Sequence, residues 1–338
     1  MPMTAPLAGV RIVEFAGMGP GPFAAMLLAD LGAEIIRIDR AGERPPSWAP
    51  NPALRGRRSI ALDLKDARGT AIALDLVARA DALIEGYRPG VMEKRGLGPE
   101  VCMGRQPALV YGRITGWGQT GPLAERAGHD LNYVALTGAL HAIGRHGQPP
   151  APPLNILGDY AGGGAYLALG LVAAIMQARS TGKGQVVDAA MVDGAASLAT
   201  TLHWMSRTGR WSEERGTNAF DSGDPFYDVY ATADDRYISI APIEPQFYSE
   251  LRRVLGLDGP EWDRRSRADR PRQRAALQAI FRGKTRDEWE RLFEGSDACF
   301  APVLTPQEAP LHPHNVARGT FIGDGVQARP GPAPRLGG

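Results

Sequence analysis

Over its first 115 residues the chain alternates short apolar runs with longer segments of helical periodicity. The apolar runs have the length of strands, and each is separated from the next by enough residues for a crossover. Strands that alternate with helices form a parallel sheet with helices on its faces. The order therefore predicts an α/β fold with a Rossmann-like parallel-sheet domain. The expected strands are 10–15, 34–39, 82–85 and 109–114, and the expected helices are 23–31 and 70–79.

The second half of the chain predicts an extension of this domain and then a smaller lobe. After a loose stretch at 120–155, a long apolar helix is expected to begin at Asp159 and to end near Ala178, before a strand at 184–188 and a helix at 190–207. A polar stretch at 211–224 precedes a hairpin at 226–231 and 236–241, helices at 245–255, 271–281 and 286–293, and a strand at 299–304. We predict a large domain of 1–215, with the tail 316–338 packing back on it, and a small α+β domain of 216–315.

Composition excludes several classes of protein. The 338 residues include 38 Lys and Arg against 37 Asp and Glu, so no general basic excess favours nucleic acid. Only two cysteines occur, Cys102 and Cys299, and they form no Cys-x-x-Cys pair. We therefore expect neither a disulfide scaffold nor a metal site.

One stretch resembles a membrane span. Residues 160–176 are 17 uncharged residues, at the lower limit of length for spanning, but they include four glycines. We interpret them as a buried helix and expect no membrane association. Residues 1–9 lack the basic and apolar regions of a signal peptide, so we expect a cytoplasmic protein.

The loop at 17–22 partly matches a dinucleotide-binding fingerprint. Gly17 and Gly19 follow the first expected strand, and Asp39 ends the second, as the acid that binds a ribose would. However, Pro22 replaces the third glycine, and Pro20 removes a backbone donor. A structural strand–helix turn is the favoured interpretation, and a nicotinamide-dependent oxidoreductase is the distant alternative.

Further candidate residues are individually unspecific. An arginine-rich run at 37–58 could bind phosphates or form a solvated loop. His129 precedes an apolar helix, whereas Asp159 and Glu244 stand where ordinary helix-start acids would. The run contains Arg37, Arg40, Arg44, Arg55, Arg57 and Arg58 against Asp39 and Glu43. The chain has no Gly-x-Ser-x-Gly, His-Glu-x-x-His or Walker motif, so serine hydrolases, zinc proteases and P-loop NTPases lose their main support.

Taken together, ordered motifs over nearly the whole chain resemble the class III CoA-transferase superfamily. They are PLAGVRIVE at 6–14, ADLGAEIIRID at 29–39, LDLK at 62–65, EGYRPG at 85–90, TGWGQTGP at 115–122, GHDLNY at 128–133, VDAAMVDG at 187–194 and EPQFY at 244–248. The superfamily aspartate falls on Asp159, and the histidine typical of its racemase branch falls on His129. The resemblance therefore implies a racemase that interconverts (2R)- and (2S)-2-methylacyl-CoA thioesters. The alternative is a CoA transferase in which Asp159 is the nucleophile, and a non-catalytic binding protein is less favoured because both residues are intact.

The same resemblance implies partners and further site residues. We expect an interlocked homodimer and no cofactor beyond the CoA of the substrate. Glu244 and Asn155 would orient His129 and Asp159. The CoA moiety would contact Arg40, Arg88, Lys94 and Tyr133.

The implied chemistry removes an α-proton on one face and returns one on the other, through an enolate. We expect His129 and Asp159 to alternate as base and acid, and the backbone N–H of Asp159 or Tyr160 to stabilise the enolate oxygen. A helix N-terminus lowers the pKa of Asp159 and burial raises it, and the sequence does not decide between them.

Overall fold

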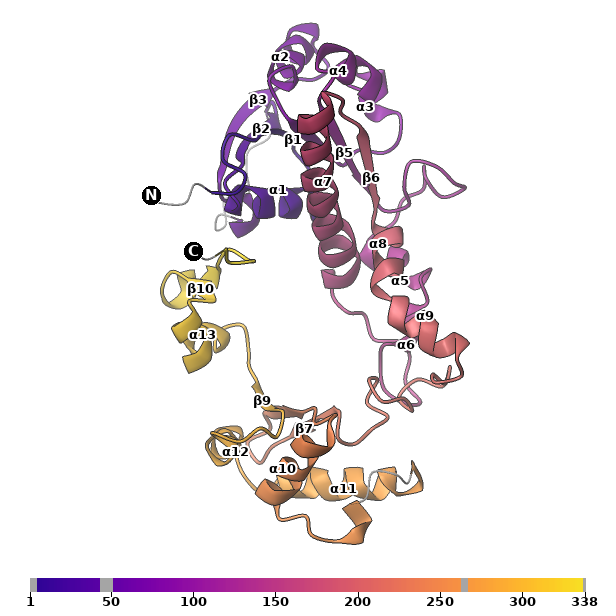
Figure 1. Ribbon diagram of the computed structural model, residues 1–338, viewed down its shortest axis with the longest axis vertical. Coiled ribbons are helices and arrows are strands. Elements are labelled where there is room, and N and C mark those ends of the chain that lie inside the picture. Colours follow the sequence, from indigo (N-terminus) through magenta and orange to yellow (C-terminus); the bar gives the residue numbers. More distant parts are fainter. Residues whose placement is uncertain (1–4, 43–50, 263–266, 337–338) are drawn as a thin grey trace. The chain divides into compact units, whose positions relative to one another are not determined.

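One parallel sheet with the strand order β3-β2-β1-β4-β5-β6 forms the framework of the first part of the chain (Figure 1). The computed structural model describes residues 5–42, 51–262 and 267–336. This order confirms the predicted parallel α/β sheet. The strand numbers fall from β3 to β1 and then rise from β4 to β6, so the order of the chain through the sheet reverses between β1 and β4 while all strands stay parallel. The strands are β1 (Arg11–Phe15), β2 (Glu34–Arg40), β3 (Arg57–Leu62), β4 (Ala82–Glu85), β5 (Val110–Thr115) and β6 (Val186–Ala190).

Helices cover both faces of this sheet. Apolar side chains alternate along the strands, so that Ile12 of β1 faces α1 and α7, whereas Val13 faces α2, α3 and α4. Each face is a separate buried cluster, and burial of one such side chain contributes about 1.5–3 kcal/mol. The helices are α1 (Pro20–Asp30), α2 (Ala67–Val77), α3 (Val91–Lys94), α4 (Pro99–Arg105), α5 (Asp130–Ala135), α6 (Ala139–Ala142), α7 (Tyr166–Thr181), α8 (Met191–Leu198) and α9 (Thr200–Arg207).

The strand β3 was not among those expected from the sequence. Four of its six residues are exposed, and it pairs only with β2, at the edge of the sheet. Charged side chains on an edge strand discourage pairing with another chain, and Arg57 and Arg58 begin this one. The strand was not recognised because its first two residues belong to the arginine-rich run that we interpreted as a loop or phosphate site.

The long apolar helix begins earlier than predicted. A π-helical segment, η2 (Ile156–Ala165), precedes α7, so Asp159 lies inside the first turn and Asn155 is the N-cap. Its glycines permit close packing: a Cβ on Gly164 would lie 2.8 Å from the backbone oxygen of Pro20, and one on Gly162 2.7 Å from the backbone nitrogen of Ala195. Within the part of the chain that the structure describes, the segment 156–181 forms one helix that is long and apolar enough to span a membrane. Half of its most apolar 18-residue stretch is buried.

The second part of the chain has its own antiparallel sheet, in the order β7-β8-β9, and its own aromatic core. That core includes Phe226, Tyr230, Phe281 and Trp289. The strands are β7 (Asp228–Ala231), β8 (Tyr237–Ile240) and β9 (Phe300–Val303), and the helices are α10 (Pro245–Leu255), α11 (Arg270–Phe281), α12 (Arg286–Phe293) and α13 (Pro313–Arg318). A short ladder joins β10 (Phe321–Ile322) to β11 (Arg329–Pro330).

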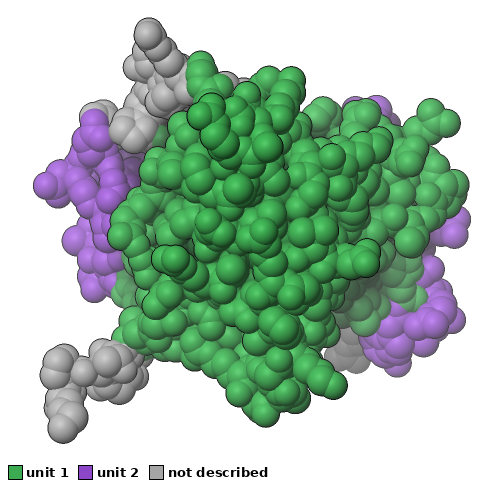
Figure 2. Space-filling view, turned by 90° about the horizontal axis from the view of Figure 1, so that it is seen from above, with its two compact units in different colours: residues 1–140, 152–203, 332–338 green, residues 141–151, 204–331 purple. Residues whose placement is uncertain are grey.

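The chain divides into two compact units (Figure 2). Unit 1 comprises Met1–Leu140, Pro152–His203 and Pro332–Gly338, and unit 2 comprises His141–Ala151 and Trp204–Gly331. The units change at 203/204, whereas the sequence analysis set a domain boundary at 215/216 and assigned 316–338 to the large domain. A compact unit need not be a domain that folds alone, so the domain limits stay a prediction.

Candidate active site

Asp159 lies beside Gly19, which follows β1 at the carboxyl edge of the parallel sheet. Open α/β sheets bind ligands at this edge, where the strand order reverses, and here the reversal lies between β1 and β4. Gly19 is the N-cap of α1 and has φ +66°. A Cβ at this position would lie 3.2 Å from Asp159 Oδ2. The turn therefore brings a carboxylate to the place where the fold accepts ligands.

This arrangement favours the structural interpretation of the Gly17–Pro22 loop. Pro20 and Pro22 occupy the first turn of α1, where a pyrophosphate site needs backbone donors. The Asp159 carboxylate, rather than a phosphate, approaches Gly19. The geometry thus offers no support for the nicotinamide alternative.

The groups around Asp159 shift the pKa of its carboxyl group. Asn155 Nδ2 donates a hydrogen bond to Asp159 Oδ2 over 3.4 Å. Burial raises the pKa of Asp159 above its usual value, and the hydrogen bond from Asn155 opposes this. The charge of Asp130 adds to the rise, whereas the charge of a protonated His129 lowers the pKa. Burial therefore outweighs the hydrogen bond from Asn155, and Asp159 is a stronger base than an exposed aspartate.

Asp130 holds the backbone of the Asp159 turn. Its Oδ2 accepts hydrogen bonds from the N–H groups of Gly158 and Asp159, at 2.7 and 2.6 Å, and the residue is 5% exposed. The Asp159 N–H is therefore already bonded, and our prediction that it could stabilise an enolate oxygen is wrong. Tyr160 lies within η2, and the role of its N–H as a donor stays a prediction.

His129 is the N-cap of α5, immediately before Asp130. Its own N–H donates to Asn132 Oδ1 at 3.1 Å, which fixes the backbone at the helix start. His129 is exposed and lies near enough to Asp159 for its charge to affect that carboxyl. The structure thus brings His129, Asp159 and Asn155 together, and their predicted catalytic roles stay predictions.

Tyr133 packs beneath this site. Its ring meets Trp117 edge-on, with centroids 4.8 Å apart, and its hydroxyl donates to the Gly128 carbonyl. The residue is only 7% exposed, which indicates a packing role, and its predicted contact with CoA stays untested. Burial and the charge of Asp159 raise the pKa of Tyr133, and the charge of Arg88 opposes them. Arg88 itself is exposed on the loop between β4 and α3.

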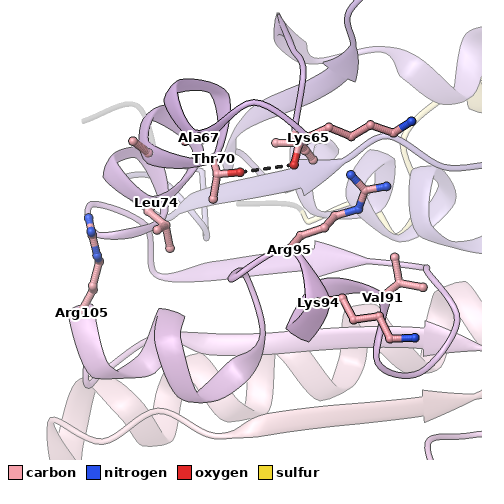
Figure 3. A pocket seen from close by; sticks show the side chains of 10 residues that line it. Lys65, Ala67, Thr70, Leu74, Val91, Lys94, Arg95 and Arg105 are labelled. Carbon is pink, nitrogen blue, oxygen red and sulfur yellow. Dashed lines mark hydrogen bonds between the residues drawn. The ribbon is translucent and has the colours of Figure 1, made fainter.

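Lys94 lines a basic cavity of about 630 Å³ between α2, α3 and α4 (Figure 3). Lys65, Lys94 and Arg95 extend toward the same side of this cavity, and Arg105 lies at the other end. The remaining lining is largely apolar and includes Leu64, Ala67, Ala71, Leu74 and Val91. Our site prediction missed Lys65, although it is one of only four lysines in the chain and belongs to the LDLK motif.

Buried ion pairs hold the α3 turn in place. Arg113 of β5 donates to Glu85 Oε1 at 2.8 Å and to both carboxylate oxygens of Glu93 at 2.8 and 3.2 Å. Glu85 is fully buried at the end of β4, and Glu93 adjoins Lys94. Arg113 thus fixes the segment that bears Lys94 to the sheet.

Most of the arginine-rich run forms structural ion pairs. Glu14 is fully buried and pairs with Arg37 and Arg57, while Arg55 pairs with Asp30. Arg58 pairs with Glu34. Among these arginines, Arg40 ends β2 and is exposed, and Arg44 lies outside the described residues. The ion pairs therefore weaken the phosphate interpretation for Arg37, Arg55, Arg57 and Arg58, and it stays a prediction for Arg40 and Arg44.

Glu244 belongs to unit 2. It is exposed and is the N-cap of α10, whereas His129, Asp159 and Asn155 all belong to unit 1. Its predicted role in orienting a catalytic residue stays a prediction.

Comparison with known families agrees with these features. The model of CoA-transferase family III matches residues 7–333. The chain belongs to CoA-transferase family III. It is 47% identical to an alpha-methylacyl-CoA racemase of Mus musculus over 98% of the chain and 86% of that protein, and 46% identical to the Homo sapiens racemase with the same coverage.

More distant members of CoA-transferase family III include transferases and solved structures. A succinyl-CoA:glutarate CoA-transferase of Mus musculus is 33% identical, over 88% of this chain and 72% of that protein. A CaiB/BaiF family protein from Brucella suis has a TM-score of 0.82 at 27% identity, covering 99% of this chain and 93% of the other. The fold is therefore that of the family.

Proposed function

We propose that this protein is an isomerase that interconverts (2R)- and (2S)-2-methylacyl-CoA thioesters. The observation that supports it most is the pairing of His129 with an Asp159 whose pKa is raised by burial. The high identity to proteins named alpha-methylacyl-CoA racemase supports the same reaction.

The reaction moves one proton and leaves the carbon skeleton unchanged. One residue of the pair removes the proton from C2, and the electrons move onto the thioester oxygen to give an enolate. The other residue then returns a proton to the opposite face of C2. A positioned acid or base contributes roughly 10²–10⁴-fold to such a step. A more basic Asp159 serves this step better than an exposed aspartate, because burial raises the pKa of Asp159 and so its affinity for the C2 proton.

The enolate oxygen needs a donor, and we assign this role to the Tyr160 N–H at the start of η2. Removal of one such donor costs roughly 10²–10³-fold in rate. Asn155 would hold the Asp159 carboxylate in place through its amide, 3.4 Å away. Glu244 would orient His129.

The CoA moiety would bind through cations of unit 1. Lys94 in the basic cavity, Arg88 on the β4–α3 loop and Arg40 at the end of β2 are suited to phosphate groups. Tyr133 would support this surface from beneath. Binding energy from CoA, remote from C2, can be used to position the reacting carbon.

We further propose that the enzyme acts as an interlocked homodimer in the cytoplasm, without a membrane, nucleic-acid, metal or cofactor requirement. CoA would enter only as part of the substrate.

Incubation with (2R)-2-methylacyl-CoA in D₂O, without an acceptor acid, tests the proposal. We expect deuterium at C2 and collapse of the methyl doublet in the proton NMR spectrum. A second candidate is suggested by the relatives named CoA-transferases, in which Asp159 would attack the thioester. Absence of exchange, with CoA transfer once a carboxylic acid is added, would establish that candidate instead.

A further inference from the structure

Asp130 has a hydrogen-bonding pattern that its position in the core does not require. The residue is 5% exposed, and its Oδ2 accepts both N–H groups of the Gly158–Asp159 turn. Its Oδ1 is also buried and has no hydrogen-bond partner among the described residues. A buried carboxylate oxygen without a partner is costly.

An ordinary helix cap would not need this charge. Serine, threonine and asparagine accept the same backbone hydrogen bonds without bringing a charge into the interior. The start of η2 offsets part of the cost, because a helix N-terminus stabilises an anion. The unpartnered Oδ1 nevertheless indicates that the charge itself has a use.

The position of Asp130 joins the two expected catalytic residues. It follows His129 in the chain and is the first residue of α5, and it holds the N–H of Asp159 at 2.6 Å. A side chain of any size on Gly158 would disturb this contact, since a Cβ there would lie 2.7 Å from Asp130 Oδ2. Movement of Asp130 would therefore move both residues.

We propose that Asp130 is a positioning residue: its carboxylate fixes the Asp159 turn against the His129 turn and sets a second negative charge beside the Asp159 carboxylate. This inference rests on the proposed racemase function. The second charge makes ionisation of Asp159 less favourable, which adds to the effect of burial on its pKa.

The other groups that face Asp159 are few. At the start of α5, the charge of His129 lowers the pKa of Asp159 and so opposes the effect of Asp130. Tyr133 lies on the same helix. From the N-cap of η2, Asn155 donates a hydrogen bond, and α1 presents Gly19. Helix α8 packs on η2 through its backbone at Gly194 and Ala195. Asp130 is thus the acidic neighbour that acts on Asp159 among these groups.

Substitution Asp130→Asn separates charge from hydrogen bonding, because the amide oxygen can still accept both N–H groups. We expect the acidic limb of the pH profile for C2 deuterium exchange to move to lower pH by about one unit. We expect kcat at the plateau to fall about 3- to 10-fold, since a weaker base is slower. Asp130→Ala also removes the acceptor and should lose more kcat, with a similar KM.

The matched control is Asp81→Asn. Asp81 Oδ2 also accepts a backbone N–H, from Arg11 at 2.8 Å, but at the opposite edge of the sheet, where β1 and β4 begin. This variant should leave the pH profile unchanged. An unmoved profile in Asp130→Asn, or an equal movement in Asp81→Asn, overturns the proposal.

A readout without turnover separates this inference from the proposed function. The protein can be labelled with ¹³C at the carboxyl carbons of its aspartates and followed by NMR. The signal that is absent in Asp159→Asn belongs to Asp159. The titration of this signal should move to lower pH in Asp130→Asn. If wild type shows no exchange but this titration moves, the racemase proposal fails and the role of Asp130 stands. If Asp130→Asn does not fold, Asp130→Ser replaces it, and failure of both to fold contradicts a role confined to the site.

Discussion

Asp159 Oδ2 lies against Gly19, so close that a Cβ at position 19 would approach it to 3.2 Å. The contact links the strand–helix turn after β1 to the first turn of η2. It supports the structural interpretation of a loop that resembles a dinucleotide-binding turn. At the edge of the sheet where such folds bind ligands, this loop contacts a carboxylate.

Substitution Gly19→Ala should therefore disturb catalysis more than binding. The backbone of Gly19, with φ +66° and ψ −115°, lies in a region that residues other than glycine rarely adopt, so alanine should cost about 1–3 kcal/mol of stability, and the new methyl group would displace the Asp159 carboxylate. A misplacement of this kind can cost roughly 10²-fold in kcat. Steady-state kinetics and thermal unfolding measure the two effects.

Gly182→Ala is the matched control for that experiment. Gly182 has φ +71° at the end of α7 and open space around its Cβ position. It should lose less stability, because φ +71° with ψ +7° is the αL conformation that other residues adopt more readily, and it should retain kcat. Equal losses of kcat in the two variants would show that backbone strain, and not contact with Asp159, is responsible.

Loss of either catalytic candidate should abolish deuterium exchange. His129→Ala and Asp159→Ala each remove one of the two groups that exchange the C2 proton, and we expect kcat to fall at least ~10²-fold with CoA affinity retained. His314→Ala, an exposed histidine on α13, is the control. Wild-type turnover in either site variant would remove that residue from the mechanism.

The raised pKa of Asp159 also predicts a dependence of stability on pH. Because the folded state disfavours the ionised carboxyl, the charge of Asp159 destabilises the protein once the pH is above its folded pKa. Asp159→Asn should therefore be more stable than wild type at pH 7. The difference should disappear as the pH falls below the unfolded value, where both forms are neutral. Denaturant unfolding at several pH values checks this, and a less stable variant at pH 7 would contradict it.

Lys94 should contribute to binding rather than to chemistry. Lys94→Ala should raise the KM for acyl-CoA about 10-fold with little change in kcat, because it removes an interaction that substrate and transition state share. The effect should weaken with added salt. Lys183→Ala, at an exposed turn after α7, should change neither constant. A fall in kcat at constant KM would place Lys94 in a different role.

The buried pair of Arg57 and Glu14 should matter for stability alone. Arg57→Ala leaves the fully buried Glu14 with Arg37 as its remaining ion-pair partner among the described residues and should cost about 3–5 kcal/mol in free energy of unfolding. KM should stay unchanged, because Arg57 is bonded within the fold. Urea unfolding and steady-state kinetics measure the two quantities, and a raised KM without loss of stability would restore the phosphate interpretation.

Local patterns predicted the elements that end at clear boundaries. The predicted ranges of β4, α10 and α12 equal those in the structure, since each has a sharp stop such as Gly256 after α10. The strand β3 was missed because an exposed, arginine-bearing edge strand has no apolar alternation. The ion pairs of the arginine-rich run could not be predicted, because their partners Glu14 and Asp30 lie far away in the sequence.

The site was predictable in its residues but not in its contacts. His129, Asp159 and Asn155 come from motifs, and the structure brings them together. The bond from the Asp159 N–H to Asp130 depends on the approach of α5 to η2, which no spacing in the sequence reveals. The rise in the pKa of Asp159, which burial causes against the hydrogen bond from Asn155, also needed the packed structure.

The central claim is that the enzyme exchanges the C2 proton on both faces. The most direct test begins with (2R)- and (2S)-2-methylacyl-CoA in separate D₂O incubations without an acceptor acid. Both should reach the same mixture of epimers, with one deuterium at C2. Two unchanged epimers without deuterium would contradict the account.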